Sequence, residues 1–201
     1  MTTEQTNKSA LKIRKAATKL FGKYGFYNVS IKEIAAEAGT NSALISYYYG
    51  GKKQLYAAVI AQQSELIEHL QDKIKKLEEP ALTLIYDYLE AIMKAQLNKD
   101  DNLGLLYREV LTPTGLCDVI IGNHLKSLHS FTQELLARAV AEKSLKPLPD
   151  QASTAFILES VTVLIFLVRR QLAESFEEEM SYDQVLRKII TAYFVPYLIN
   201  N

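Results

Sequence analysis

The stretch SIKEIAAEAGTNSALISYYYGGK constrains the fold of this chain more than any other, because it predicts two short helices joined by a tight turn. Ser30 and Glu33 form the S-x-x-E pattern of a capping box, in which the serine oxygen caps a helix and the glutamate reaches back to the serine amide. Gly39 follows where the end of a helix favours a residue that accepts positive φ. Asn41 or Ser42 can cap the second helix. Together these features make the helix-turn-helix pattern.

The second of these two helices is the part that would read DNA. In a helix-turn-helix protein it lies in the major groove, and its early residues meet base edges. The candidates here are all small or polar: Thr40, Asn41, Ser42, Ala43, Ser46 and Tyr47. The same pattern also arises by chance as an αα-corner in a helical core, so both interpretations stay open at this point.

The distribution of charge favours the nucleic-acid interpretation. The 201 residues carry 23 basic and 23 acidic side chains and no net charge. Residues 1–55 nevertheless hold nine lysines and arginines against three acids, which leaves 14 against 20 in the remainder. A basic end on a neutral chain is typical of a nucleic-acid-binding module joined to another domain. The lysines of the first helix can equally be its solvent-exposed face; they are Lys12, Lys15, Lys19 and Lys23.

The whole chain predicts helices and no strand, because its apolar residues recur at helical spacing. We expect an all-α protein of about nine helices in two domains. A small helix-turn-helix bundle is expected over residues 1–51, followed by a larger helical domain over 52–201. Besides the helix-turn-helix, helices are expected from Asn7 or Ser9 to Tyr24 and at 52–77, 80–97, 101–111, 115–142, 151–177 and 181–199.

Two of the late helices predict a subunit interface. The helix around residues 160–168 is apolar on nearly every side, so it is expected to be central in a core or covered by a partner. Two such helices from each of two chains would form a four-helix bundle, and a two-fold dimer suits a helix-turn-helix reader of paired half-sites. The expected interface residues are Val161, Leu164, Ile165, Val168, Phe194 and Tyr197.

A ligand pocket is more plausible in the second domain than a catalytic or metal site. The spacing of His124 and His129 is not the i, i+4 spacing of a metal pair, and no nucleophile, phosphate-binding or dinucleotide motif occurs. We therefore expect no enzyme activity, no metal and no cofactor. The candidate pocket residues are Tyr88, Met93, Tyr107, Cys117, His124, Phe131 and Phe156, although each of these is individually more often a core residue.

The sequence resembles the TetR family of transcriptional regulators. The resemblance rests on ATKLFGKYGFYNVSIKEIAAEAGTNSALISYYYGGKKQLY, residues 17–56, which combine LF-x-x-YGF, a serine before the IA-x-x-AG helix and a tyrosine-rich end before GGK. The segment YREVLTPT, residues 107–114, further resembles a motif in a subgroup with its own C-terminal domain.

The resemblance implies a homeodomain-like DNA-binding domain over residues 1–51 and a domain over 52–201 that binds a ligand and dimerises. It also implies that Ser30 and Lys52 contact phosphate and that Tyr48 joins the residues of the recognition helix. Ser46 departs from the family, which commonly has tyrosine there, so Tyr47 or Tyr48 is expected to supply the aromatic contact. We expect a cytoplasmic homodimeric repressor that binds a palindromic double-stranded DNA operator and is released by a small molecule. The alternative is a helical interaction protein whose first domain binds protein or non-specific nucleic acid.

Overall fold

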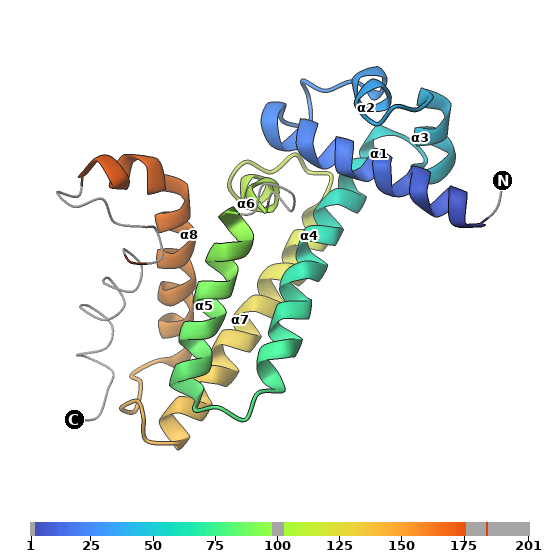
Figure 1. Cartoon of the computed structure of the whole chain (residues 1–201). Coiled ribbons are helices and arrows are strands. Elements are labelled where there is room, and N and C mark those ends of the chain that lie inside the picture. The colour runs from blue at the N-terminus through green and yellow to red at the C-terminus, as the bar shows by residue number, and fades with distance from the viewer. Residues whose placement is uncertain (1–2, 98–102, 176–183, 185–201) are drawn as a thin grey trace. The chain divides into compact units, whose positions relative to one another are not determined.

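The computed structural model describes residues 3–97, 103–175 and 184 of the chain (Figure 1). All eight elements in these ranges are α-helices, and no strand occurs among them, which confirms the predicted all-α class. Of the ninth helix, predicted over residues 181–199, the structure describes residue 184 alone, which is helical.

The helix bounds follow the predicted order. They are α1 Thr3–Tyr24, α2 Ile31–Glu37, α3 Ser42–Tyr49, α4 Lys52–Lys75, α5 Ala81–Leu97, α6 Gly104–Leu111, α7 Asp118–Ala141 and α8 Gln151–Ser175. Helix α7 begins three residues after the predicted start at residue 115. Gly115 has a φ of 77°, and the amide of Leu116 donates to Thr114 Oγ1 at 3.2 Å, so this segment forms a turn before the helix begins.

The chain divides into two compact units. The first comprises Met1–Ile67 and Ala95–His124, and the second comprises Glu68–Lys94 and Leu125–Asn201. Helices α4 and α7 each begin in the first unit and end in the second. The first unit thus contains α6 and the start of α7 in addition to α1–α3. The predicted domain boundary between residues 51 and 52 stays a prediction.

The core of the first unit is built around three aromatic rings. Phe21 and Tyr56 pack edge to face with their centroids 5.1 Å apart, and Phe26 lies 5.0 Å from Tyr56. Ile34 of α2 and Ile45 of α3 are fully buried, so both short helices bury an apolar face, as their periodicity predicts. Helices α1, α2 and α3 contact one another, and α6 contacts α1.

The second unit has a core of its own. The rings of Tyr88 on α5 and Phe131 on α7 pack with centroids 4.7 Å apart. Gln71 Nε2 donates to the Tyr88 hydroxyl at 3.1 Å, and Ser127 Oγ donates to Gln71 Oε1 at 3.2 Å. These bonds satisfy polar groups that would otherwise be costly to bury. Within the described ranges, no helix has the length and apolar character that crossing a membrane requires.

Candidate nucleic-acid interface

Helix α2 is fixed at its N-terminus by the predicted capping box. Ser30 is extended, with φ −98° and ψ 157°, and its hydroxyl accepts from the Glu33 amide at 3.2 Å. Glu33 Oε2 accepts in return from the Ser30 amide at 2.7 Å. Hydrogen bonds from the Ser30 side chain and then from its backbone lower the pKa of the Glu33 carboxyl. The helix end that would face phosphate is therefore held in one geometry.

The turn after α2 is a Schellman motif. The Gly39 amide donates to the Ala36 carbonyl at 3.1 Å, and the Thr40 amide donates to the Ala35 carbonyl at 2.9 Å. Gly39 has a φ of 62°, and a Cβ added there would meet no atom within 4 Å. Glycine is thus favoured at this position by backbone conformation and not by lack of space, as the sequence predicts.

Asn41 caps α3, which resolves the choice between Asn41 and Ser42. Its Oδ1 accepts from the Ala43 amide at 2.9 Å. At the other end, the Tyr49 hydroxyl donates to the Ala10 carbonyl at 2.8 Å and ties α3 to α1. Ile45 anchors the middle of the helix in the core. Helix α3 is therefore held at both ends and at its centre.

The outer face of α3 presents part of the predicted recognition set. Asn41, Ala43 and Ser46 are exposed, and Tyr47 is 75% exposed. The other predicted members are half-buried: Thr40, Ser42 and Tyr48. The Tyr48 ring packs edge to face against Tyr47 with centroids 5.0 Å apart, and its hydroxyl is buried without a hydrogen-bond partner in the described chain. Of the two tyrosines, Tyr47 is the one that reaches solvent.

Lys52 begins α4 beside this surface. Gly50 and Gly51, with φ of 78° and 130°, carry the chain from α3 into α4. The Lys52 ammonium lies 4.3 Å from the centroid of the Phe26 ring, a cation–π contact. Burial lowers the pKa of Lys52, and the nearby Glu33 carboxyl acts against that shift. Lys52 is thus held next to the capped start of α2.

Known proteins share this arrangement. The model of the family described as "Bacterial regulatory proteins, tetR family" matches residues 13–59, which run from α1 into α4. The HTH-type transcriptional dual regulator CecR of Shigella flexneri is 32% identical over 136 residues, which cover 61% of this chain and 60% of that protein. The chain therefore carries a TetR-family domain at residues 13–59.

Two solved structures share the fold of this chain. AibR in complex with isovaleryl coenzyme A and operator DNA has a TM-score of 0.75 at 18% identity, covering 94% of this chain and 100% of that one. A gamma-butyrolactone receptor described as an ArpA-like protein has a TM-score of 0.72 at 20% identity, covering 85% of each chain. The likeness extends well beyond the 47 residues of the family model.

A buried polar cluster joins α4 to α6 and to the segment that follows α6. The Tyr56 hydroxyl donates to Glu109 Oε2 at 2.7 Å, while Glu109 Oε1 accepts from the Thr114 amide at 2.9 Å and from the Thr114 hydroxyl at 2.7 Å. Glu109 is 1% exposed. Arg108 Nη1 lies 3.4 Å from the Phe21 carbonyl at the end of α1. The YREVLTPT segment therefore joins α6 to both α1 and α4.

Sequence reasoning missed this cluster, although it singled out the segment for its resemblance. The bond between Tyr56 and Glu109 joins residues 53 positions apart. Burial raises the pKa of Tyr56, and the hydrogen bond to Glu109 raises it further. Burial, followed by the charge of Glu109, also raises the pKa of the Cys117 thiol to about 12. The only available signal was the charged pair Arg108 and Glu109 within a helix whose other residues are glycine, tyrosine or aliphatic.

The predicted pocket residues fall into both compact units. Tyr107, Cys117 and His124 are buried in the first unit, and His124 Nδ1 lies 3.1 Å from Ser64 Oγ. Burial lowers the pKa of His124 to about 4, so its imidazole is neutral at pH 7. In the second unit, Tyr88 and Phe131 are buried against each other, whereas Phe156 is 63% exposed. The Met93 side chain lies outside the described residues, and the pocket itself stays a prediction.

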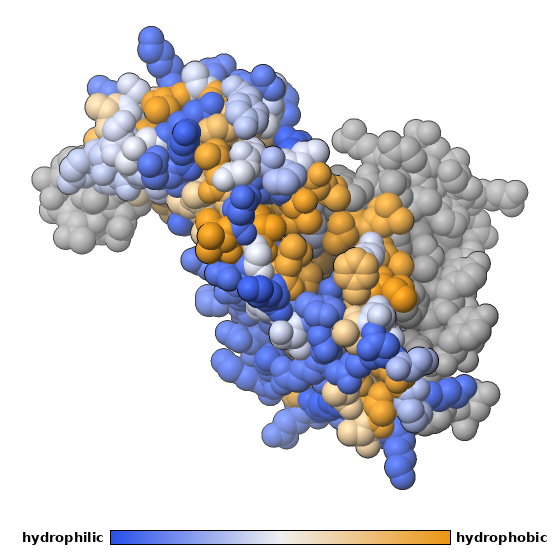
Figure 2. All heavy atoms as spheres, turned by 180° about the vertical axis from the view of Figure 1, so that it is seen from behind, coloured by the Kyte–Doolittle hydropathy of each residue, from blue (hydrophilic) through white to orange (hydrophobic). Residues whose placement is uncertain are grey.

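The predicted interface residues are described only in part. Leu164 on α8 is 57% exposed and Val161 is half-buried. The side chains of Ile165 and Val168, and all of Phe194 and Tyr197, lie outside the described residues. Apolar atoms reach the surface of the described chain, as the orange atoms of Figure 2 show. On α8 they belong to Phe156, Ile157 and Leu164.

Proposed function

We propose that this chain is a TetR-family DNA-binding transcriptional repressor that acts as a homodimer in the cytoplasm. The exposed outer face of α3 carries the proposal, because the helix is held rigidly and presents Asn41, Ala43, Ser46 and Tyr47 together. Its eight residues span about 12 Å, and the major groove of B-DNA is about 12 Å wide. No catalytic activity is part of this proposal.

The chemistry of the face limits what it can read. Asn41 Oδ1 already accepts from the Ala43 amide, so only its Nδ2 is left to donate to a base or a phosphate. Ser46 can donate or accept, and Ala43 can contact a thymine methyl group. Tyr47 supplies the one large side chain of the set and is supported from behind by Tyr48. We expect a short recognised sequence in each half-site, with two half-sites related by the two-fold axis of the dimer.

Selection from a library of random duplexes tests the proposal, since no operator needs to be known in advance. Purified protein should enrich one palindromic sequence, and Tyr47→Ala should weaken binding to that sequence more than to random duplex. The alternative, an interaction protein that binds nucleic acid without discrimination, predicts salt-dependent binding with no enriched sequence. That outcome would overturn the proposal.

Lys52→Ala should weaken binding to the enriched and the random duplex equally. Lys52 lies beside the capped start of α2, where it can contact phosphate but reads no base. Losing one phosphate contact should lower the slope of log affinity against log salt by about one unit. Fluorescence anisotropy titrations between 50 and 300 mM salt would measure that slope. A loss confined to the enriched sequence would contradict a phosphate contact.

Control by a small molecule is the second part of the proposal. Its support is that AibR was solved with isovaleryl coenzyme A as well as operator DNA, and that another structural neighbour is a gamma-butyrolactone receptor. This chain buries aromatic and polar side chains in both units; they include Tyr107 and His124 in the first and Tyr88 and Phe131 in the second. Within either unit, side chains of these kinds suit a mostly apolar ligand with a few polar groups. Isovaleryl coenzyme A and a gamma-butyrolactone are the first probes to try.

The proposed route of control runs along α4, which continues without Gly or Pro from the first unit into the second. His69→Gly with Asp72→Gly should soften this helix without a change of register, because both side chains are exposed. Each glycine should cost about 1 kcal/mol of helix stability relative to alanine. His69→Ala with Asp72→Ala is the matched control.

Operator affinity with and without the probe gives the readout of this experiment. Coupling of about 1–3 kcal/mol would loosen the operator complex roughly 5- to 150-fold in wild type and in the alanine control. The glycine variant should lose most of that response. If it folds and releases DNA as the wild type does, the coupling does not depend on a stiff α4.

A further inference from the structure

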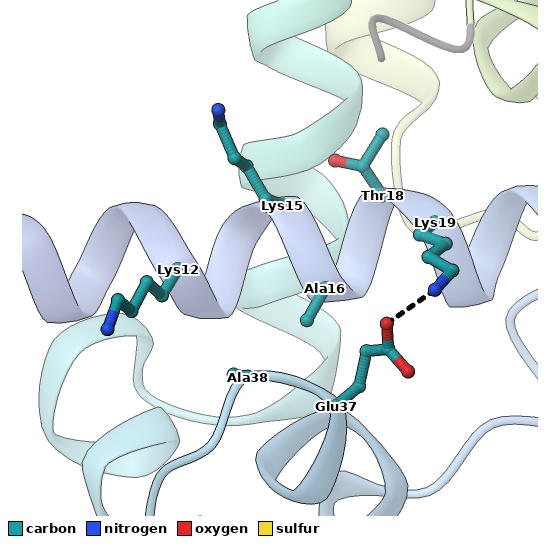
Figure 3. Close-up of a pocket in the computed structure, with 7 residues that line it drawn as sticks. All are labelled: Lys12, Lys15, Ala16, Thr18, Lys19, Glu37 and Ala38. Carbon is teal, nitrogen blue, oxygen red and sulfur yellow. Dashed lines mark hydrogen bonds and ion pairs between the residues drawn. The ribbon is translucent and has the colours of Figure 1, made fainter. Parts of the chain in front are cut away.

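A groove with a basic wall lies between α1 and α2 (Figure 3). Its volume is about 480 Å³, and its lining comes from one face of α1 and from the last turn of α2. The lining residues are Lys12, Lys15, Ala16, Thr18, Lys19, Glu37 and Ala38. Three lysines against one glutamate make this groove a cation-rich site, separate from the outer face of α3.

The lysines belong to a continuous stripe. Lysines at positions 8, 12, 15, 19 and 23 repeat at intervals of four, three, four and four, so they share one face of α1. From the first to the last, the stripe is about 22 Å long at 1.5 Å per residue. All five side chains are exposed. Like charges three and four residues apart destabilise a helix by roughly 0.2–0.5 kcal/mol per pair, so an anion bound along the stripe would offset part of that cost.

Acidic side chains offset only part of the positive charge in the groove. Lys19 Nζ lies 2.6 Å from Glu37 Oε1, and the two side chains are 67% and 37% exposed. Among the described residues, neither Lys12 nor Lys15 has an ion pair. In Figure 3, Lys12 and Lys19 extend toward α2, whereas Lys15, which also lines the groove, extends away from α2. Lys12 is therefore the uncompensated charge on the α2 side of the groove.

The position of the groove indicates which anion it fits. Its α2 wall ends at Ala38, which is followed directly by the Gly39–Thr40 turn that leads into the outer face of α3. A duplex that lies against the start of α3 carries a phosphate strand past the same turn. Duplex DNA also presents one charge per 1.7 Å of axis, a density that suits an extended row of lysines.

We propose that Lys12 contacts a DNA phosphate flanking the segment that α3 reads, and that Glu37 restrains this contact by pairing with Lys19. The inference rests on the proposed function as a DNA binder. It adds a second, sequence-independent contact surface on α1 to the surface formed by α2, α3 and Lys52. It also predicts that removing the charge of Lys12 and removing the charge of Glu37 change DNA affinity in opposite directions.

Substitutions that each remove one charge test this proposal on random and enriched duplexes of 30 base pairs. Lys12→Gln should weaken binding to both roughly five-fold at 0.15 M salt and lower the salt slope by about 0.9, as the loss of one phosphate contact requires. Glu37→Gln should tighten binding to both, by up to about five-fold, because it frees Lys19. Circular dichroism melting verifies that each exposed variant keeps its fold.

Two control variants distinguish a local contact of Lys12 with DNA from an effect of the protein's overall positive charge. Lys23→Gln removes the same charge from the same stripe of α1 but outside the groove lining, so its effect should stay below about two-fold. Lys146→Gln removes an equal charge from an exposed position in the second unit and should have no measurable effect. Equal losses for Lys12→Gln and Lys23→Gln would leave only a solvated basic face and overturn the proposal.

Titration with sodium tripolyphosphate distinguishes a free anion from the DNA backbone. Tripolyphosphate binding that Lys12→Gln abolishes, with duplex binding unchanged, would assign the groove to a soluble anion and overturn the DNA contact. The random-duplex experiment does not need an operator. If the wild type enriches no sequence but Lys12→Gln still weakens random-duplex binding, the groove contact stands while the proposed repressor function fails.

Discussion

Glu109→Ala should lower the free energy of unfolding by about 2–5 kcal/mol, because it leaves several hydrogen-bond donors without their acceptor. The Tyr56 hydroxyl and the Thr114 amide and hydroxyl all donate to this 1% exposed carboxyl group. The substitution also removes packed methylene groups from the core of the first unit. Urea denaturation followed by circular dichroism would show the loss as a lower midpoint.

A double-mutant cycle separates the hydrogen bond between Tyr56 and Glu109 from the loss of volume. Tyr56→Phe keeps the ring against Phe21 and removes only the donor, and Glu109→Gln keeps the shape and one acceptor oxygen. Residues joined in one hydrogen-bond network typically couple by about 0.5–3 kcal/mol. A coupling energy near zero, together with an unchanged midpoint for Glu109→Ala, would show that the cluster contributes nothing to stability.

The local features of α2 and α3 could be predicted because the residues that form each cap or turn are close in sequence. Ser30 and Glu33 are three residues apart, and their types fix the capping geometry of α2. Gly39 ends the same helix for a conformational reason that its residue type reveals. Asn41 and Ser42 are both good caps, so the sequence left the choice open until the structure placed the Asn41 oxygen on the Ala43 amide.

The interactions that position these helices could not be predicted, because they join distant residues. Tyr49 bonds to Ala10 across 39 positions, and Tyr56 bonds to Glu109 across 53. Periodicity assigns a residue to a face of its helix, but it does not say which other helix that face meets. The same limit applies to Lys12, whose charge is plain in the sequence but whose place in a groove beside α2 is not.

The predicted dimer interface has support from the exposed side of α8. Leu158 and Thr162 are buried on this helix, whereas Phe156, Ile157 and Leu164 are 63, 50 and 57% exposed. Large apolar side chains gathered on an exposed face mark an interaction site more often than scattered ones do. The predicted four-helix bundle between two chains would cover them.

Leu164→Glu should convert the dimer to a folded monomer. Leu164 is exposed in the single chain, so a glutamate there can stay in water and should leave the monomer fold intact. In a two-fold dimer the substitution occurs on both sides of one interface and would bury two unpaired carboxylates, at a cost of roughly 3–5 kcal/mol each. Sedimentation velocity should therefore show the mass of one chain, with an unchanged helical circular dichroism spectrum.

The matched control for this experiment is Leu77→Glu, which introduces the same charge at another exposed leucine, 44% exposed and outside α8. It should remain dimeric. A dimer that survives Leu164→Glu unchanged would place the interface elsewhere. The Leu164→Glu monomer also has a consequence for DNA binding, because a single chain presents one copy of α3 and can occupy one half-site. Its affinity for the enriched palindrome should fall towards its affinity for an isolated half-site, whereas the Leu77→Glu dimer should still distinguish the two.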